Sequence, residues 1–300
     1  MTRVAAIDCG TNSIRLLISD EGKDIARRME IVRLGEGVDR TGRLEKAAID
    51  RTRQALLGYA AEIAELGIRR VRMVATSASR DASNADDFRA MVRSVLGVEP
   101  EVISGDEEAA LSFHGAVQGI PGDEQKLVVD IGGGSTEFIT GVSEVAAAIS
   151  VDIGCVRMTE RHLHTDPPTA GEVAAAERDI TAAVDRALAA VPGREATTLV
   201  GLAGSVTTVA ALALGLDEYD PSLIHHARIS YDDVARVTGE LLSKTVAERT
   251  ALPVMHPGRA DVIGAGALIL RTIMTRAEQD HVVASEHDIL DGIAMGLSRS

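Results

Sequence analysis

Residues 8–18 read DCGTNSIRLLI, and residues 130–140 read DIGGGSTEFIT. Aligned without gaps, both segments follow one plan: Asp-x-Gly, two small or polar residues, Ser, and then an apolar segment. An apolar run precedes each copy, at residues 4–7 and 127–129. The pattern predicts a strand, an acidic turn and a second strand, used twice. It therefore indicates two related halves that hold one anionic ligand.

Both turns have the composition of a phosphate-binding loop. Glycine permits positive φ and the close approach of another group, and successive N–H groups in such a turn form a nest for an anion. The predicted phosphate ligands are Gly10, Thr11, Asn12 and Ser13 in the first copy and Gly132, Gly133, Gly134, Ser135 and Thr136 in the second. A single Asp-Gly turn also fits an ordinary hairpin, but the repetition and the three consecutive glycines favour function.

In each copy of the pattern an aspartate, Asp8 or Asp130, follows the first strand. A carboxylate there would repel phosphate directly, so we expect these aspartates to have another role. We predict that Asp130 holds Mg²⁺ and that Asp8 contributes through water. Glu137 is the second metal candidate in the second copy, and Arg15 occupies its place in the first. One hairpin thus carries a cation for phosphate and the other a carboxylate for metal. The alternative is that Arg15 and Glu137 are solvated strand residues.

The composition narrows the classes of function. The 300 residues suffice for two domains with sizeable cores. With three Phe, three Tyr and no Trp, the chain has few rings for stacking single-stranded bases. A net charge of −14 disfavours a general polyanion-binding surface. We therefore expect no nucleic-acid partner and a local phosphate site.

The cysteines and apolar runs favour a cytoplasmic protein with no membrane segment. Cys9 and Cys155 form neither a disulfide framework nor a zinc spacing. The first residues lead directly into a strand, without the features of a signal peptide. The longest apolar run, residues 262–270, is interrupted by Gly264 and Gly266.

Strand and helix patterns alternate in both halves. The first half is predicted to contain a hairpin, a third antiparallel strand, two further strands and three helices, with Gly67 ending the first helix and Asn84 capping the second. The polar, turn-rich residues 119–124 suggest domains 1–123 and 124–300, with a last helix able to pack back on the first domain. The fold class is α/β, with mixed sheets flanked by helices.

Together these residues resemble the exopolyphosphatase and guanosine pentaphosphate phosphohydrolase family, within the actin, sugar-kinase and chaperone ATPase superfamily. The similarity covers nearly the whole chain. Besides the two turns, it rests on ATSASR at 75–80, ISGDEEA at 103–109, GCVR at 154–157, GLAGS at 201–205, LP at 252–253 with RADVI at 259–263, and DILDG at 288–292.

The resemblance implies two ribonuclease-H-like domains with the active site in the cleft between them. It also implies Mg²⁺-dependent hydrolysis, with Mn²⁺ as an alternative metal, of a terminal phosphoanhydride. The substrate is then inorganic polyphosphate or guanosine tetra- or pentaphosphate. Longer relatives append a helical C-terminal region that this sequence, ending at Ser300, does not contain. This difference favours short chains or a nucleotide. A homodimer and a nucleotide regulator are further expectations.

The resemblance assigns the catalytic base to Glu108. Hydrolysis needs a water positioned in line, and a carboxylate can orient it and accept its proton. In a closed cleft near other carboxylates, the pKa of such a base would rise toward neutrality. From the residues alone, the acidic run at 106–108 could merely complement a helix N-terminus, and Glu107 is expected to have that structural role.

Three further residues are predicted to bind phosphate. Arg80 can grip a terminal phosphate with its guanidinium fork; the alternative is a salt bridge to a nearby aspartate, at position 81, 86 or 87. Gly204 and Ser205 lie where a strand leads into a helix, so their amides suit an anion, although Ser205 could simply be an N-cap. The paired histidines at 162/164 and 225/226 lack accompanying ligands and are expected to be structural.

Other functions fit the repeated turn. A small-molecule kinase of the same superfamily would need an aspartate base, and no aspartate is marked out for that task. A nucleotide-switched assembly protein would need subunit-joining surfaces, and a polyphosphate sensor without turnover would not need both Glu108 and Glu137.

Overall fold

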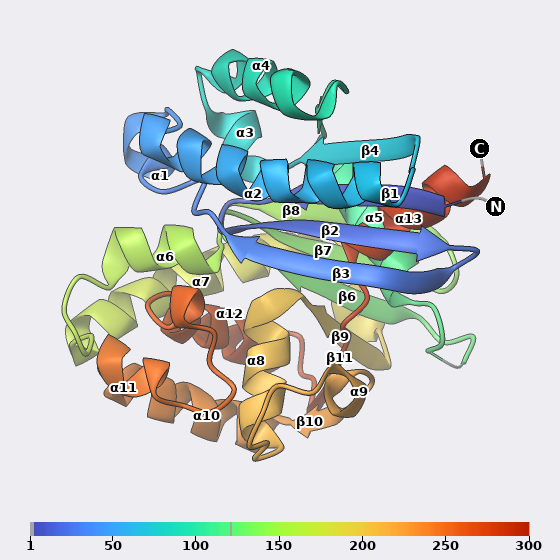
Figure 1. Ribbon diagram of the computed structural model, residues 1–300. Helices are drawn as coiled ribbons and strands as arrows, with labels where there is room; N and C mark the ends of the chain where they lie inside the picture. Colours follow the sequence, from blue (N-terminus) through green and yellow to red (C-terminus); the bar gives the residue numbers. More distant parts are fainter. Residues whose placement is uncertain (1–2, 121, 300) are drawn as a thin grey trace. The chain divides into compact units, whose positions relative to one another are not determined.

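The structure is a computed structural model that describes residues 3–120 and 122–299. The contacts divide the chain into two compact units (Figure 1). Unit 1 comprises Met1–Gly115 and Ile289–Ser300, and unit 2 comprises Ala116–Asp288. The border between the units lies at the end of α5 (Gly105–Ala116). The predicted domain border after residue 123 remains a prediction.

Unit 1 contains a five-stranded sheet in the order β3-β2-β1-β4-β5. Strand β1 pairs antiparallel with β2 and parallel with β4, so the sheet is mixed. The strands are β1 (Arg3–Cys9), β2 (Ser13–Asp20), β3 (Lys23–Ile31), β4 (Arg70–Ala75) and β5 (Glu101–Val102). The hairpin and third antiparallel strand predicted from the sequence are confirmed.

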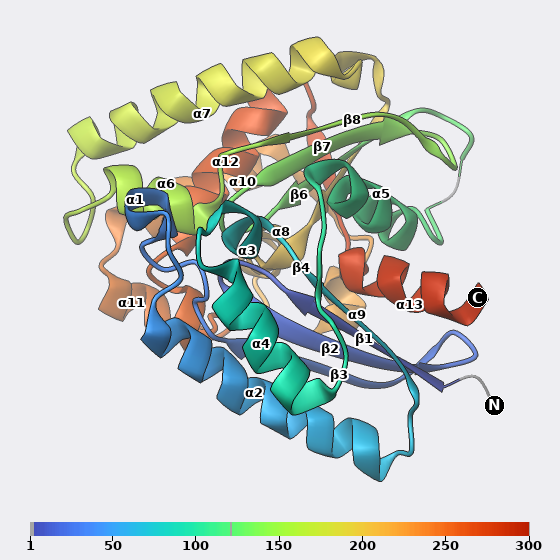
Figure 2. The same cartoon turned by 90° about the horizontal axis from the view of Figure 1, so that it is seen from above.

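Helices cover both faces of this sheet, which explains why β1 is buried along its length after Arg3. On one face, Ala5 and Ile7 pack with residues of α2 (Lys46–Glu65) and α4 (Ala85–Leu96), which lie side by side (Figure 2). On the other face, Val4 and Ala6 pack with the last helix, α13 (Ile289–Arg299). Alternate residues of one strand therefore supply two cores.

Unit 2 repeats this plan. Its six-stranded sheet has the order β10-β11-β9-β6-β7-β8, and β8-β7-β6-β9-β11 corresponds to the whole sheet of unit 1. The strands are β6 (Lys126–Ile131), β7 (Thr136–Gly141), β8 (Val145–Val151), β9 (Thr198–Leu202), β10 (Arg228–Ser230) and β11 (His281–Ala284). This shared topology is the ribonuclease-H-like arrangement that was expected.

The helices of unit 2 form one large core with its sheet. The longest, α7 (Ala170–Ala190), begins with a Thr169–Glu172 capping box and packs against α12 (Ile263–Arg276). Unit 2 also contains α6 (Cys155–His162), α8 (Ala203–Ala213) and α10 (Tyr231–Ser243). Within the described part of the chain, no helix combines the length and apolar character that a membrane span requires.

Several local predictions need correction. Gly67 does end α2 with a φ of 65°, but Asn84 makes no capping bond to α4 and binds Leu44 instead. Helix α8 begins at Ala203, so Ser205 lies inside its first turn and is not the N-cap. The periodicity also missed short helices: α1 (Val38–Thr41), α3 (Ser77–Asp81), α6, α9 (Pro221–Ile224) and α11 (Val246–Thr250).

Candidate active site

The two sequence repeats are structural repeats. In the β1–β2 hairpin Asp8 lies opposite Arg15, and in the β6–β7 hairpin Asp130 lies opposite Glu137. An equivalent hydrogen bond closes both turns. The Gly10 N–H donates to the Ser13 carbonyl at 3.0 Å, and the Gly132 N–H donates to the Ser135 carbonyl at 3.1 Å. The gapless alignment is therefore confirmed, including the exchange of a cation for a carboxylate.

Close approach is required at Gly132 but not at Gly10, where a Cβ would lie no closer than 3.7 Å to another residue. Neither Gly10 nor Gly132 adopts a left-handed conformation, so the expected use of positive φ is wrong for them. A Cβ at Gly132 would lie 3.1 Å from the Ser135 carbonyl oxygen. Gly154, just before α6, packs closely on the second turn: a Cβ there would overlap the backbone of Gly133 and lie 2.5 Å from the nitrogen of Gly134.

The first turn joins a partly buried ion pair to a pair of buried hydroxyls. Arg15 donates from Nη2 and Nε to Asp8 Oδ2, at 2.7 and 3.1 Å, and Asp8 is buried. Arg15, predicted to bind phosphate, and Asp8, predicted to bind metal through water, therefore form an ion pair with each other. Thr11 Oγ1 lies 2.9 Å from Ser77 Oγ in a buried contact, so β1–β2 and α3 present hydroxyls together.

Arg80 and Glu108 are brought together although they lie far apart in the sequence. Arg80 Nη1 donates to Glu108 Oε2 at 3.2 Å and to the Ile103 carbonyl at 3.1 Å. Glu108 is only 8% exposed. The salt bridge suggested for Arg80 thus has Glu108, and not a neighbouring aspartate, as its partner. The adjacent Glu107 instead pairs with Arg72 at 2.9 Å on the surface, as a structural role predicts.

The second hairpin carries the predicted metal ligands. Asp130 is 8% exposed and Glu137 is 1% exposed, so Glu137 is not a solvated strand residue. Ser150 Oγ donates to Glu137 Oε1 at 2.7 Å and orients it. Among the described residues, no group of three His, Cys, Asp or Glu side chains is placed to hold a metal. Two carboxylates alone still fit Mg²⁺, which takes its other oxygens from water and substrate phosphates.

Residues at the start of α6 donate hydrogen bonds to the carbonyl groups of the glycine turn at 132–134. Cys155 N–H donates to Gly132 O at 3.0 Å, and Arg157 Nε donates to Gly134 O at 2.7 Å. The N–H of Val156 donates to Gly133 O at 2.9 Å. These bonds use the carbonyl side of the turn, whereas an anion nest uses the N–H side.

A further arginine lies at the start of α8, where Gly204 and Ser205 were predicted to bind phosphate. Arg259 packs against Gly204, since a Cβ there would lie 2.8 Å from Arg259 Nη1, and it donates to Thr208 Oγ1 at 2.8 Å. Ala203 adopts a φ of 66°, which is uncommon for a residue with a Cβ. The sequence analysis noticed the motif at 259–263 but did not predict that Arg259 lies beside Gly204.

The cysteines are packed thiols. Both are buried and unpaired. Burial raises the pKa of the Cys155 thiol, although the Ser205 hydroxyl and the Arg259 charge partly oppose the effect. Burial also raises the pKa of Cys9, helped by the charge of Asp8. Neither thiol is therefore suited to nucleophilic chemistry.

The histidines form a packed cluster in unit 2. The rings of His225 and His226 stack with centroids 3.7 Å apart, and His287 lies 4.4 Å from His225. His162 binds Asp179 at 3.0 Å. These contacts agree with the structural role predicted for the paired histidines.

Protonation of His226 is expected to destabilise the protein below neutral pH. Burial, and then the charge of His287, lowers the pKa of His226 from its ordinary value of 6.5. The unfolded chain therefore takes up this proton at higher pH than the folded chain, so stability is undiminished above 6.5 and falls as the pH drops below it. Replacing His226 by Asn, which tolerates its left-handed φ of 66°, should flatten the fall in melting temperature. Identical pH profiles for the two proteins would contradict this.

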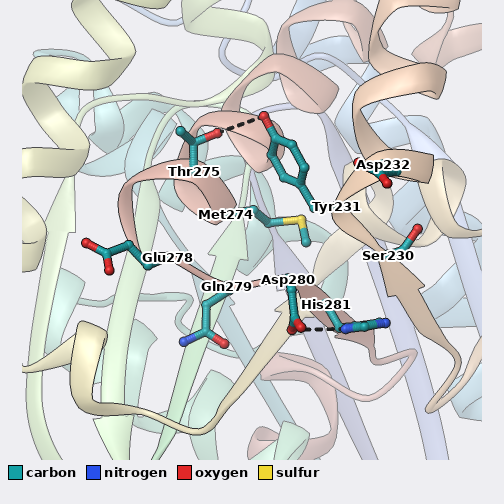
Figure 3. A pocket seen from close by; sticks show the side chains of 9 residues that line it. All are labelled: Ser230, Tyr231, Asp232, Met274, Thr275, Glu278, Gln279, Asp280 and His281. Carbon is teal, nitrogen blue, oxygen red and sulfur yellow. Dashed lines mark hydrogen bonds and ion pairs between the residues drawn. The ribbon is translucent and has the colours of Figure 1, made fainter.

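A pocket of about 450 Å³ lies elsewhere in unit 2, between the start of α10 and the loop from α12 to β11 (Figure 3). Its described lining contains three carboxylates, from Asp232, Glu278 and Asp280, and no Lys or Arg. Thr275 donates to the Tyr231 hydroxyl at 3.2 Å across one wall (Figure 3). The charge is unsuited to phosphate, and the pocket contains none of the predicted site residues.

Comparisons with known proteins establish the family of this chain. The Ppx/GppA phosphatase family matches residues 18–299. Exopolyphosphatase 2 of Mycobacterium tuberculosis is 51% identical over 316 aligned positions, which cover 99% of each chain. The crystal structure of an exopolyphosphatase-like protein superposes with a TM-score of 0.96 at 42% identity, covering 99% of each chain. An exopolyphosphatase from Cytophaga hutchinsonii, 27% identical, gives 0.88 and covers 99% of this chain and 98% of its own. The chain described here therefore belongs to the Ppx/GppA phosphatase family.

Proposed function

We propose that the protein is an exopolyphosphatase that hydrolyses the terminal phosphoanhydride of inorganic polyphosphate and releases orthophosphate, with a preference for short chains. The observation that carries the proposal is the 3.2 Å contact between Arg80 and Glu108. It couples a cation suited to a terminal phosphate with a nearly buried carboxylate suited to water activation. The similarity to Exopolyphosphatase 2 over the full chain supports the choice of substrate.

In the proposed reaction, Glu108 orients a water molecule and accepts its proton as the oxygen attacks the terminal phosphorus. The bond from that phosphorus to the bridging oxygen breaks, and the shortened chain leaves with that oxygen. Arg80 holds Glu108 Oε2 and adds positive charge where the transferred phosphoryl group develops negative charge. The hydroxyls of Thr11 and Ser77, which face one another, and the amides of the turn at 132–134 are proposed to bind phosphate oxygens.

Mg²⁺ is the proposed cofactor, with Asp130 and Glu137 as its protein ligands. Members of phosphoryl-transfer families usually use a divalent metal, which neutralises phosphate charge when bound. The buried pair of carboxylates, directly opposite one another in the β6–β7 ladder, fits the sparse protein coordination of Mg²⁺. Asp8 remains a weaker candidate because Arg15 engages it.

Replacing Glu137 by Gln is expected to raise the Mg²⁺ concentration for half-maximal activity by at least about ten-fold, since loss of even an indirect metal partner has that effect. The measurement is a Mg²⁺ titration of phosphate release. Ser150→Ala, which removes only the 2.7 Å bond to Glu137, serves as a milder control and should give a smaller shift. An unchanged titration midpoint in Glu137→Gln would remove Glu137 from the metal site.

The proposed activity is tested by phosphate release from short polyphosphate, long polyphosphate, ATP and guanosine pentaphosphate, each with Mg²⁺ or with EDTA. We expect the fastest release from short polyphosphate, and none with EDTA. A clear preference for guanosine pentaphosphate would make the protein a nucleotide phosphohydrolase. Transfer of labelled phosphate to an added sugar or alcohol would indicate a kinase, and absence of turnover with every substrate would refute the proposal.

Two further expectations belong to the proposal. Two buried, unpaired thiols support a reducing compartment, and thus the cytoplasm. A homodimer is proposed from the family resemblance, and light scattering would measure it directly.

A further inference from the structure

A segment of unit 1, residues 32–44, lies against the first phosphate turn; we call it the strap. It connects β3 to α2 and contains α1. Two successive N–H groups of the strap donate to Asn12 O, at 3.0 and 2.8 Å, and the N–H of Gly35 donates to Thr11 O at 2.9 Å. The strap therefore binds the carbonyls of the first turn. In unit 2 the start of helix α6 binds the carbonyls of the corresponding turn.

Gly35 packs between the turn and α3. A Cβ at this position would overlap the Thr11 methyl group, and would lie 3.2 Å from Thr11 Cβ and 3.1 Å from Ala78 Cβ. Thr11 is buried and its hydroxyl is paired with Ser77. The missing side chain of Gly35 therefore leaves the space that the Thr11 methyl group occupies, and this fixes the direction of the hydroxyl.

The far end of the strap is attached near α4. Gly42 O accepts hydrogen bonds from Ser83 N–H at 2.9 Å and from Ser83 Oγ at 3.0 Å. The Asn84 side chain accepts from Leu44 N–H at 2.8 Å and donates to Leu44 O at 3.1 Å. The strap thus spans from the first turn to the segment directly after α3, the helix that carries Arg80.

We propose that the strap positions the phosphate ligands of unit 1, and that Gly35 is the positioning residue through which it sets the Thr11 hydroxyl. Leu34 and Val38 of the strap are buried in the core of unit 1 and anchor the segment there. Arg51 of α2 holds its start, donating to the Val32 carbonyl at 2.8 Å. The inference rests on the proposed role of Thr11 in phosphate binding.

The test is a double-mutant cycle between Gly35→Ala and Thr11→Ser. Gly35→Ala is expected to raise KM for short polyphosphate by about ten-fold, because the displaced Thr11 hydroxyl would lose its hydrogen bond to a charged phosphate. The change in kcat should be smaller. Thr11→Ser deletes the methyl group that the new Cβ would meet. In that background the same Gly35 substitution should change KM by less than about two-fold. Gly58→Ala, where no atom lies within 4 Å of the added Cβ, is the matched control and should leave KM unchanged.

A second variant covers the case in which Gly35→Ala does not fold. Asn84→Ala removes both hydrogen bonds to Leu44 without adding an atom, and should raise KM by about three-fold with a modestly lower melting temperature and little change in kcat. Asn84→Asp keeps the acceptor for Leu44 N–H and should recover part of the effect. Unchanged KM in both Gly35→Ala and Asn84→Ala, or an equal Gly35 effect in the two Thr11 backgrounds, would overturn the proposal.

Calorimetric binding of inorganic phosphate separates this inference from the proposed function. If the wild type binds phosphate but hydrolyses no polyphosphate, the proposed function fails, and weaker binding in Gly35→Ala still supports the strap. If the wild type hydrolyses polyphosphate and Gly35→Ala matches it in KM and binding, the function stands and the strap proposal fails. If the wild type neither binds nor hydrolyses, both are wrong.

Discussion

Replacing Glu108 by Gln is expected to lower kcat for phosphate release from short polyphosphate by about 10²–10⁴-fold, the usual contribution of a general base. Gln has nearly the same shape and keeps an oxygen that can accept the Arg80 hydrogen bond, now 3.2 Å long. It cannot accept the proton of the attacking water. KM should change much less than kcat, because the group acts in the transition state.

The adjacent glutamate provides the control. Glu107→Gln removes the same charge one residue away, from a side chain that is half exposed and pairs with Arg72 at 2.9 Å. Exposed ion pairs contribute little, so stability and activity should both be nearly unchanged. If Glu108→Gln retains wild-type kcat, or if Glu107→Gln loses as much, Glu108 is not the base. Equal melting temperatures in the two variants would exclude a folding defect.

The fold was predictable to the extent that it depends on periodicity and on the repeated turn. Buried strands have strong hydrophobic patterns, and so β1 and β6 contain the apolar runs at residues 4–7 and 127–129 from which they were predicted. Short helices such as α3 and α6 have only five and eight residues, too few for a pattern to appear. Their role is to present Arg80 and to clasp the glycine turn, and those contacts come from distant segments.

Pairing of side chains across long separations was the least predictable part of the site. Arg80 had three aspartates close in sequence, but α5 presents Glu108 to it because β4 and β5 are neighbours in the sheet. Asn84 likewise has the composition of a cap, yet the strap offers it a better partner in Leu44. In both cases tertiary contacts override a local preference that was correctly identified.

Replacing Gly154 by Ala is expected to lower kcat/KM by about 10²-fold, because a displacement of roughly 1 Å among residues that position the substrate has an effect of that size. The added Cβ would overlap Gly133 and lie 2.5 Å from Gly134 N. These are backbone atoms, which cannot rotate away as a side chain could. Either the glycine turn or the start of α6 must therefore move, and both lie in the proposed phosphate site.

The matched control is Gly171→Ala in the first turn of α7, where no atom lies within 4 Å of the added Cβ. The chemical change is identical, and Ala is a better helix former than Gly by up to about 1 kcal/mol. Gly171→Ala should therefore keep full activity and melt no earlier than the wild type, whereas Gly154→Ala should melt earlier. If Gly154→Ala has wild-type kcat/KM, close packing of α6 on the turn is unnecessary for catalysis. The anion nest would then have to be sought in the first hairpin alone, where a Cβ at Gly10 meets no atom closer than 3.7 Å.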